Sequence, residues 1–306
     1  MSLRQRLVDA GHDLRVMAAV VSDAYVRPLP RAEDGPLVTV LIAAYNRSAV
    51  LRYALASAVG QTYRNLEILV IGDACTDDSE QVVAAAGDPR VRWMNLERNC
   101  GSQAGPNQAG LEAARGQLIA YLGQDDVWRH DHVALLVADI ERTGADATSA
   151  VPSFAWPKPV AVRRLESPRA GDVVPTPSLM HTRDAGLAAG GWRDHRQTVL
   201  PPDADFIVRL RQSGARFSRV RALSLLKFAS ALRRDSYRDG RSDEQAAAAR
   251  RVDGRAFAAR EVLAALASMP LRPWYGRHAE TLVPAELTEQ PGGVIAEYRR
   301  IRGLQP

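Results

Sequence analysis

Apolar residues in this chain gather in short runs that alternate with segments of helical spacing. The runs with a strand-like pattern are residues 37–44, 66–71, 91–96 and 118–123. The segments between them with a 3.6-residue period are 49–60, 79–86 and about 108–115. Apolar runs of this kind are typical of strands inside a sheet that is covered on both faces. Strands that alternate with helices need crossover connections, so the pattern predicts an α/β fold with a parallel sheet.

The remainder of the chain has a less regular pattern. Helices are predicted over residues 1–27, 129–143, 178–189, 203–213, 242–269 and 291–301, and a strand over 217–226. Prolines interrupt the stretch 151–177, which we expect to form irregular strands and loops. The changes in pattern divide the chain into an N-terminal helix with a linker (1–36), a main domain (37–230) and a helical C-terminal extension (231–306).

Polar or acidic residues follow each of the first four predicted strands. They are Asn46, Asp73, Asn99 and the pair Asp125–Asp126. Ligands of open α/β sheets bind at the carboxyl ends of the strands, so this edge is the predicted binding site. From the residues alone, an Asx-turn at a strand end is the favoured interpretation of Asp73.

The adjacent acids Asp125 and Asp126 have two interpretations. Neighbouring carboxylates repel each other unless a cation or hydrogen-bond donors offset their charge, and their oxygen atoms suit Mg²⁺ or Mn²⁺. An acidic pair before the helix predicted over 129–143 would also serve as a helix N-cap. The residues alone leave both open.

Composition narrows the class of protein. The chain has 306 residues, a net charge of +5, a pI near 9.5 and 46% hydrophobic residues, as an ordinary globular protein does. The charge suits an anionic ligand or membrane surface but is too small to indicate nucleic acid. Cys75 and Cys100 form no disulfide framework or metal motif, which favours a reducing cytosol. No apolar run reaches the roughly 20 residues of a spanning helix, and we expect a cytoplasmic or peripheral protein.

Four motifs, taken together and in order, resemble the nucleotide-sugar glycosyltransferases of family 2, which have the GT-A fold. These motifs are Val38 to Arg47, Gln61 to Val70, Asp73 with Thr76–Asp77, and Gly116 to Trp128. The resemblance covers about residues 37–230. It implies a Rossmann-like mixed sheet with helices on both faces, in which 37–128 binds the nucleotide sugar and 129–230 faces the acceptor.

The resemblance also assigns donor-binding roles. By it, Asp73 hydrogen-bonds the nucleotide base, with the N3–H of uracil or thymine favoured. The other residues assigned to the donor are Ala44, Tyr45, Asn46, Asn99, Gly101, Asn107, Gln124 and Asp125. Asp126, together with Asp125, matches the metal motif for Mn²⁺ or Mg²⁺. Gly123 and Gln124 stand where many family members carry acids, which leaves open which carboxylate contacts the metal.

Asp203 matches the catalytic base of the family, although Pro202 replaces the usual glutamate before it. A metal would neutralise charge on the leaving diphosphate while the carboxylate takes the proton of the acceptor hydroxyl. One base without a second nucleophile implies inversion at the anomeric carbon. The resemblance therefore predicts transfer of a sugar from a nucleoside diphosphate, with UDP or dTDP favoured, to a carbohydrate or glycolipid acceptor in cell-envelope synthesis.

Two alternatives stay open. A nucleotidyltransferase would show a Gly-rich basic loop after the first strand, which residues 43–47 do not form. A non-catalytic nucleotide-sugar-binding or scaffold protein is the other, because Gly123 and Pro202 depart from the family pattern. The arginines of the C-terminal region have two interpretations. They form a solvated helix face, or they bind an anionic group, either a diphosphate or the inner surface of an anionic membrane.

Overall fold

The computed structural model describes Ala18 and residues 35–155, 163–165, 174–229, 233–268 and 285–305. Apart from Ala18, the helix predicted over residues 1–27 lies outside the described residues. Within the described ranges, none of the helices combines the length and the apolar character that a membrane crossing requires.

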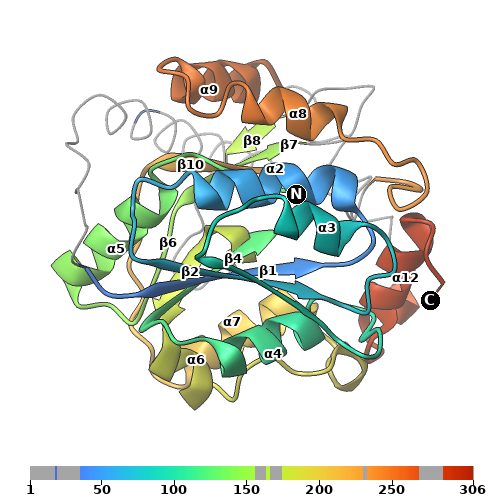
Figure 1. Cartoon of the computed structure of the whole chain (residues 1–306). Helices are drawn as coiled ribbons and strands as arrows, with labels where there is room; N and C mark the ends of the chain where they lie inside the picture. The colour runs from blue at the N-terminus through green and yellow to red at the C-terminus, as the bar shows by residue number, and fades with distance from the viewer. Residues whose placement is uncertain are drawn as a thin grey trace, which may run out of the picture.

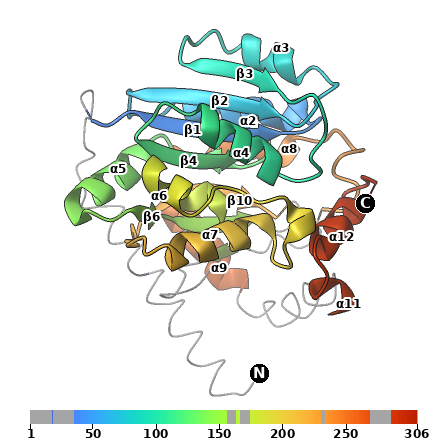
Figure 2. The same cartoon turned by 90° about the horizontal axis from the view of Figure 1, so that it is seen from below.

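The centre of the molecule is a mixed sheet of six strands in the order β3-β2-β1-β4-β9-β6. The strands are β1 (Val38–Ala44), β2 (Leu66–Gly72), β3 (Val91–Asn95), β4 (Leu118–Gly123), β6 (Ala147–Ser149) and β9 (Leu179–Thr182). The first four are parallel, as their apolar runs predict, and β9 runs antiparallel to both β4 and β6. Figure 2 shows β3, β2, β1 and β4 side by side.

Helices cover both faces of this sheet (Figure 1). On one face lie α2 (Ser48–Val59), α3 (Ser79–Ala84) and α5 (His132–Thr143); on the other lie α4 (Ala104–Ala113), α6 (Arg183–Ala188) and α7 (Pro202–Gln212). Alternate residues of the strands serve the two layers: Val40 packs with Leu51 of α2, whereas Leu41 packs in the cluster that contains Leu111 of α4. The sheet is therefore apolar on both faces, which explains the near-continuous apolar runs.

A second sheet has four strands in the order β5-β10-β7-β8. They are β5 (Val127–Trp128), β7 (Val151–Ala155), β8 (Arg163–Leu165) and β10 (Leu223–Phe228). The helices α8 (Asp243–Ala249) and α9 (Phe257–Ser268) pack against it, with Val262 in one apolar cluster with Leu226 of β10. These C-terminal helices thus share a core with the strands that follow the acidic pair.

One predicted helix is wrong in part. The helix expected over 178–189 begins only at Arg183, because Leu179–Thr182 forms β9 after a short 3-10 turn, Thr176–Ser178. Met180 and His181 are fully buried and pair with β4 on one side and β6 on the other. The Thr182 hydroxyl then accepts a hydrogen bond from the backbone N–H of Ala185 and caps α6.

The last described segment returns to the carboxyl ends of the parallel strands. It contains α11 (Ala285–Thr288) and α12 (Gly293–Ile301), and Figure 1 shows α12 beside the edge toward which β1 points. Backbone hydrogen bonds fix it there: Gly292 N–H donates to Thr198 O at 3.0 Å and Tyr237 N–H donates to Arg302 O at 3.2 Å. The C-terminal extension predicted from residue 231 onward therefore packs closely against the main domain.

Candidate active site

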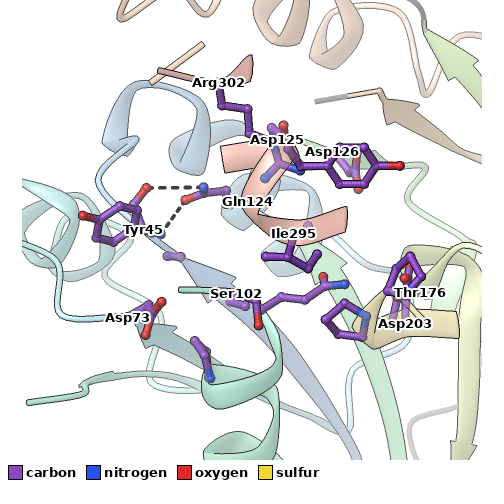
Figure 3. A pocket seen from close by; sticks show the side chains of 18 of the residues that line it. Tyr45, Asp73, Ser102, Gln124, Asp125, Asp126, Thr176, Asp203, Ile295 and Arg302 are labelled. Carbon is purple, nitrogen blue, oxygen red and sulfur yellow. Dashed lines mark hydrogen bonds between the residues drawn. The ribbon is translucent and has the colours of Figure 1, made fainter. Parts of the chain in front are cut away.

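A cavity of about 420 Å³ lies at the carboxyl ends of β1, β2 and β4 (Figure 3). Most of the residues predicted from the sequence line it. These are Ala44, Tyr45, Asp73, Gly101, Gln124, Asp125, Asp126 and Asp203. In Figure 3, Asp73 and Asp203 lie on opposite sides of the view, so the candidate base-binding and proton-accepting groups are at separate ends.

Three predicted donor residues are not among those that line the cavity. Asn46 has a positive φ of 39°, and its side-chain oxygen accepts from the backbone N–H of Thr76 at 2.7 Å. Asn99 donates from its amide to Asp73 O at 2.9 Å. Asn107 is 3% exposed on α4. Their direct contact with a donor stays a prediction, because these hydrogen bonds point to a supporting role for Asn46 and Asn99.

Asp73 connects two strand ends and does not form a local Asx-turn. Its carboxylate accepts hydrogen bonds from the backbone N–H groups of Cys100 at 2.6 Å and Gly101 at 3.2 Å. Burial raises the pKa of Asp73, and the two N–H groups oppose that shift. A carboxylate has about four acceptor positions, so Asp73 retains capacity for the N–H of a base.

Gln124 ties the strand end of β4 to two other segments. Its side-chain oxygen accepts from the backbone N–H of Tyr45 at 2.9 Å, and its amide donates to the hydroxyl of Tyr237 at 3.1 Å. The rings of Tyr45 and Tyr237 are 5.9 Å apart. Gln124 is 7% exposed, so its main contribution is to fix the loop after β1 against the C-terminal region.

The acidic pair follows a turn in which Asp126 N–H donates to Gly123 O at 3.0 Å. Antiparallel pairing of β5 with β10 sets Leu226 opposite Val127, and one further step brings Lys227 to Asp126. Lys227 Nζ lies 3.2 Å from Asp126 Oδ2. The other oxygen, Oδ1, accepts from the backbone N–H of Phe228 at 2.8 Å.

Asp125 has a separate cationic partner. Arg47 Nη1 donates to Asp125 Oδ2 at 3.1 Å, and both side chains are below 10% exposed. The guanidinium of Arg47 also lies 5.1 Å from the ring centroid of Tyr237. The N-cap interpretation of the acidic pair is wrong, because α5 begins at His132 with Asp131 in the capping position.

Burial and the neighbouring charges perturb this pair. Burial raises the pKa of Asp126 to about 6 even though Lys227 opposes the shift. Burial acts to lower the pKa of Lys227, but Asp126 and Asp125 outweigh it and raise that pKa above its ordinary value. At neutral pH, Lys227 is therefore an ammonium group beside a carboxylate.

The residues present do not fit the metal site predicted at Asp125 and Asp126. The described part of the chain contains no group of three or more His, Cys, Asp or Glu side chains that could hold a metal ion. Each carboxylate is also already paired with a cation of the chain, as above. A divalent cation bound by Asp126 would need the oxygen atom that Lys227 contacts, because the other oxygen accepts from the backbone N–H of Phe228.

Asp203 lies in the first turn of α7, after Pro201 and Pro202. Proline suits the first helical position because its missing N–H needs no partner there. Asp203 accepts from the backbone N–H of Ala204 at 3.0 Å and lines the cavity. Its carboxylate is therefore placed to accept a proton from a hydroxyl group in the cavity.

The structure adds lining residues that the sequence analysis did not assign. They include Ser102, Lys227, Tyr237, Ile295, Tyr298, Arg299 and Arg302. Arg299 donates to Gly101 O at 2.9 Å and so joins α12 to the loop held by Asp73. One signal was available for Lys227, because the sequence has only one other lysine, Lys158. Periodicity gives no sign that α12 returns to the strand ends.

Comparison with known proteins agrees with this geometry. The family model described as glycosyl transferase family 2 matches residues 39–170. The succinoglycan biosynthesis protein ExoO of Rhizobium meliloti (strain 1021) is 38% identical over 116 residues, which are 38% of this chain and 33% of that protein. The Escherichia coli protein WfaP is 37% identical over 93 residues, which are 30% of this chain and 36% of that protein. It is described as a UDP-Glc:alpha-D-GlcNAc-diphosphoundecaprenol beta-1,3-glucosyltransferase. The matches thus span about a third of these relatives.

Solved structures show the same fold at low identity. The TarS fragment 1–349 of S. aureus in complex with UDP has a TM-score of 0.53 at 16% identity, over 63% of this chain and 60% of that one. The mannosyltransferase PcManGT of Pyrobaculum calidifontis, in complex with GDP-Man and Mn²⁺, also has a TM-score of 0.53 at 16% identity, over 93% and 92%. The GT-A fold is confirmed, and residues 39–170 are similar in sequence to glycosyl transferase family 2.

Proposed function

We propose that this protein transfers a sugar from a nucleoside diphosphate to an acceptor hydroxyl, with inversion at the anomeric carbon. The observation that carries the proposal is the single cavity at the strand ends that has Asp73 on one side and Asp203 on the other. The placement of Asp73 and Asp203 on two sides of one cavity suits a ligand that has a base at one end and a reacting sugar at the other. The similarity of residues 39–170 to glycosyl transferase family 2 supports the same reaction class.

Asp203 is the proposed general base. As the acceptor oxygen attacks the anomeric carbon, its proton passes to the Asp203 carboxylate, and the bond from that carbon to the diphosphate breaks. Among the lining carboxylates, Asp125 and Asp126 are paired with cations and Asp73 holds the 99–101 loop. Asp203 is thus the acid whose described contacts leave it available to the acceptor, and one base without a second nucleophile supports inversion.

The donor base is proposed to lie against Asp73, with uracil or thymine favoured over guanine. An N3–H of a pyrimidine is a donor that a carboxylate accepts, and Asp73 has acceptor capacity left. Two of the curated relatives, WfaP and WfgD, are described as using UDP-Glc, which supports a uridine donor. Ser102 and Tyr45 also line the cavity.

The acceptor is proposed to be a sugar or sugar-lipid of cell-envelope polysaccharide synthesis. The relatives are described by succinoglycan and colanic acid biosynthesis and by a diphosphoundecaprenol-linked acceptor. A peripheral contact with an anionic membrane through the arginine-rich region remains part of this proposal. The comparisons favour neither a nucleotidyltransferase nor a scaffold protein.

A divalent metal was predicted from the sequence, and PcManGT is described with Mn²⁺. Because the acidic pair is already satisfied by Arg47 and Lys227, no step of the mechanism above passes through a metal. A metal bound there would supply charge neutralisation at the diphosphate.

A thermal-shift screen tests the proposal. The full chain is melted with UDP, dTDP, GDP, ADP and their sugar conjugates, each with Mn²⁺ and with EDTA. A ligand that binds only the folded state raises the melting temperature, so a shift with at least one nucleoside diphosphate is expected. Incubation of the best donor with lipid-linked sugars should then release the nucleoside diphosphate. No shift with any nucleotide under either condition would reject the assignment.

A further inference from the structure

The two carboxylates at the predicted metal position already have positive charges from the chain beside them. Asp126 Oδ2 is 3.2 Å from Lys227 Nζ, and Asp125 Oδ2 is 3.1 Å from Arg47 Nη1. The Asp126 side chain is fully buried, so a cation can reach it only from the cavity side, where Lys227 lies. A divalent ion would have to displace the ammonium group or lie against it, and like charges at such separations repel strongly.

Gly123 makes room for this arrangement. A Cβ atom at position 123 would lie 2.5 Å from Asp126 Oδ2. The absence of a side chain lets the Asp126 carboxylate turn back over the end of β4 and reach β10. The pair of Asp126 and Lys227 therefore depends on the residue at which the sequence departs from the acidic motif.

Lys227 has donors left for a second anion. Its ammonium group carries three N–H donors, of which Asp126 uses one. The side chain is 23% exposed and lines the cavity next to the acidic pair. Asp126 thus holds the ammonium at the cavity wall, where a diphosphate that spans from Asp73 toward Asp203 would pass.

Arg302 is a second cation that lines the cavity. It follows α12 and lies with its guanidinium carbon 5.9 Å from the ring centroid of Tyr298. Its Nε atom is buried without a hydrogen-bond partner among the described residues, whereas its side chain also hydrogen-bonds that of Tyr237. Figure 3 shows its side chain directed toward Asp125 and Asp126. A buried N–H without a partner is costly unless a ligand supplies an acceptor.

We propose that Lys227 and Arg302 bind and neutralise the donor diphosphate in place of a divalent cation. The inference rests on the proposed function and adds the means of phosphate recognition. When the bond from the anomeric carbon to the diphosphate oxygen breaks, its electron pair stays on that oxygen, and the two fixed cations stabilise the added negative charge. The acceptor forms the new bond to the anomeric carbon, and its proton goes to Asp203.

The first test is a calorimetric titration of the full chain with UDP in excess EDTA and in Mn²⁺. If the fixed cations replace the metal, the two dissociation constants agree within about threefold. Binding that appears only with Mn²⁺ overturns the inference and leaves the proposed function intact. If UDP, dTDP and GDP all fail to bind in both buffers, the proposed function and the inference fall together.

The second test separates the diphosphate from the nucleoside. Lys227→Met removes one charged donor and should weaken UDP binding in EDTA by roughly 10- to 100-fold, while uridine binding is unchanged. Lys227→Arg should recover most of the loss. Arg52→Met, on the exposed side of α2, removes the same charge away from the cavity and serves as the control. Equal UDP affinities for Lys227→Met and Arg52→Met contradict the proposal.

The third test opposes the two mechanisms directly. Asp126→Asn keeps an oxygen for the Phe228 N–H but removes the charge that a metal would need. A metal site predicts weaker UDP binding in this variant, whereas fixed cations predict binding in EDTA at least as tight as that of the wild type. Lys227→Met leaves a buried carboxylate without its partner, so the double variant Asp126→Asn/Lys227→Met is included. It should fold like the wild type by circular dichroism and still bind UDP weakly; wild-type affinity there overturns the role of Lys227.

Discussion

Arg209 donates from Nε to Oδ2 of Asp205 at 2.9 Å, one turn along the same helix. The Arg209 side chain is 9% exposed and the Asp205 side chain 13%, so this ion pair is largely shielded from water. Asp203, two residues earlier, lines the cavity instead. The two acids at the start of α7 therefore have different surroundings, and their roles can be separated by substitution.

Asp203→Asn is expected to reduce sugar transfer by roughly 10²- to 10⁴-fold, because an amide cannot accept the acceptor's proton at neutral pH. The shape of the side chain is kept, so UDP affinity should stay near the wild-type value. Turnover measured with saturating donor, together with calorimetry, checks both parts. Wild-type turnover in this variant would require another residue as the base.

Asp205→Asn is expected to act on stability. The substitution weakens the contact of a nearly buried guanidinium and should lower the free energy of unfolding by roughly 1 to 3 kcal/mol. Transfer by the folded fraction should be reduced far less than in Asp203→Asn. Urea denaturation and turnover per folded molecule provide the measurement. The reverse result, with Asp205→Asn inactive and Asp203→Asn active, would move the catalytic base by two residues.

Asp73→Asn should weaken the nucleoside part of donor binding. The amide can accept only one of the two backbone N–H groups from Cys100 and Gly101, and its own N–H faces the base. Affinity for uridine and for UDP should fall by about tenfold each. Calorimetry with both ligands distinguishes this from Lys227→Met, which should affect UDP alone. A wild-type preference for GDP over UDP and dTDP would contradict the pyrimidine assignment.

Two buried histidines should make the protein less stable in acid. Burial lowers the pKa of His132 to about 3 and that of His181 to about 4 from an ordinary 6.5. The unfolded chain binds these protons below pH 6.5 while the folded protein does not. Their stabilising contribution is therefore complete above pH 6.5 and is lost as the pH falls toward 4, at up to about 1.4 kcal/mol per pH unit for each histidine.

His181→Gln measures one of these contributions. His181 Nδ1 bonds Thr182 O at 2.8 Å, and Nε2 lies 2.9 Å from the Tyr121 hydroxyl, which itself accepts from Trp192 Nε1. The variant loses part of this network and should be less stable at pH 7. Its free energy of unfolding should nevertheless fall less steeply between pH 6.5 and 5 than that of the wild type. Parallel slopes in urea titrations would show that His181 is already charged when folded.

The sequence predicted the parallel half of the sheet well because both faces of β1, β2 and β4 are buried. The local pattern of apolar residues was therefore enough to predict these strands. β9 was missed because its burial depends on β4 and β6, which lie far from it in sequence, and the four residues Leu179–Thr182 are too few to show a period. Pairing of this kind is set by tertiary contacts.

The residues of the candidate site that lie at strand ends could be predicted from the sequence. The residues that distant segments bring to the cavity could not. Asp73 follows β2, which the pattern predicted, whereas Asp203 was assigned by the family resemblance at the start of a predicted helix; both line the cavity. The sequence could not show that Lys227 lies beside Asp126, the predicted metal ligand. Lys227 is on β10, and it becomes a neighbour of Asp126 only because β10 pairs with β5. Tyr298 and Arg302 reach the cavity through the return of α12.

The position of α12 predicts how the cavity opens. Arg299 holds the helix to Gly101 O, and backbone bonds at Gly292 and Arg302 hold its two ends. Its buried residues are few, namely Gly293, Val294 and Glu297. Elements with few apolar contacts open locally at a lower free energy than the whole protein. Amide hydrogens of 293–301 should thus exchange faster than those of β1, and UDP should slow them.

Arg299→Ala should accelerate that exchange further and leave β1 protected as in the wild type. Mass spectrometry of deuterated peptides distinguishes the two regions. If α12 exchanges only by global unfolding, its rates will match those of β1. If α12 can detach, the rate of nucleotide entry and release is set by the local unfolding of this one helix. Turnover would then be limited by a folding event at the edge of the sheet, while the catalytic groups beneath it stay in place.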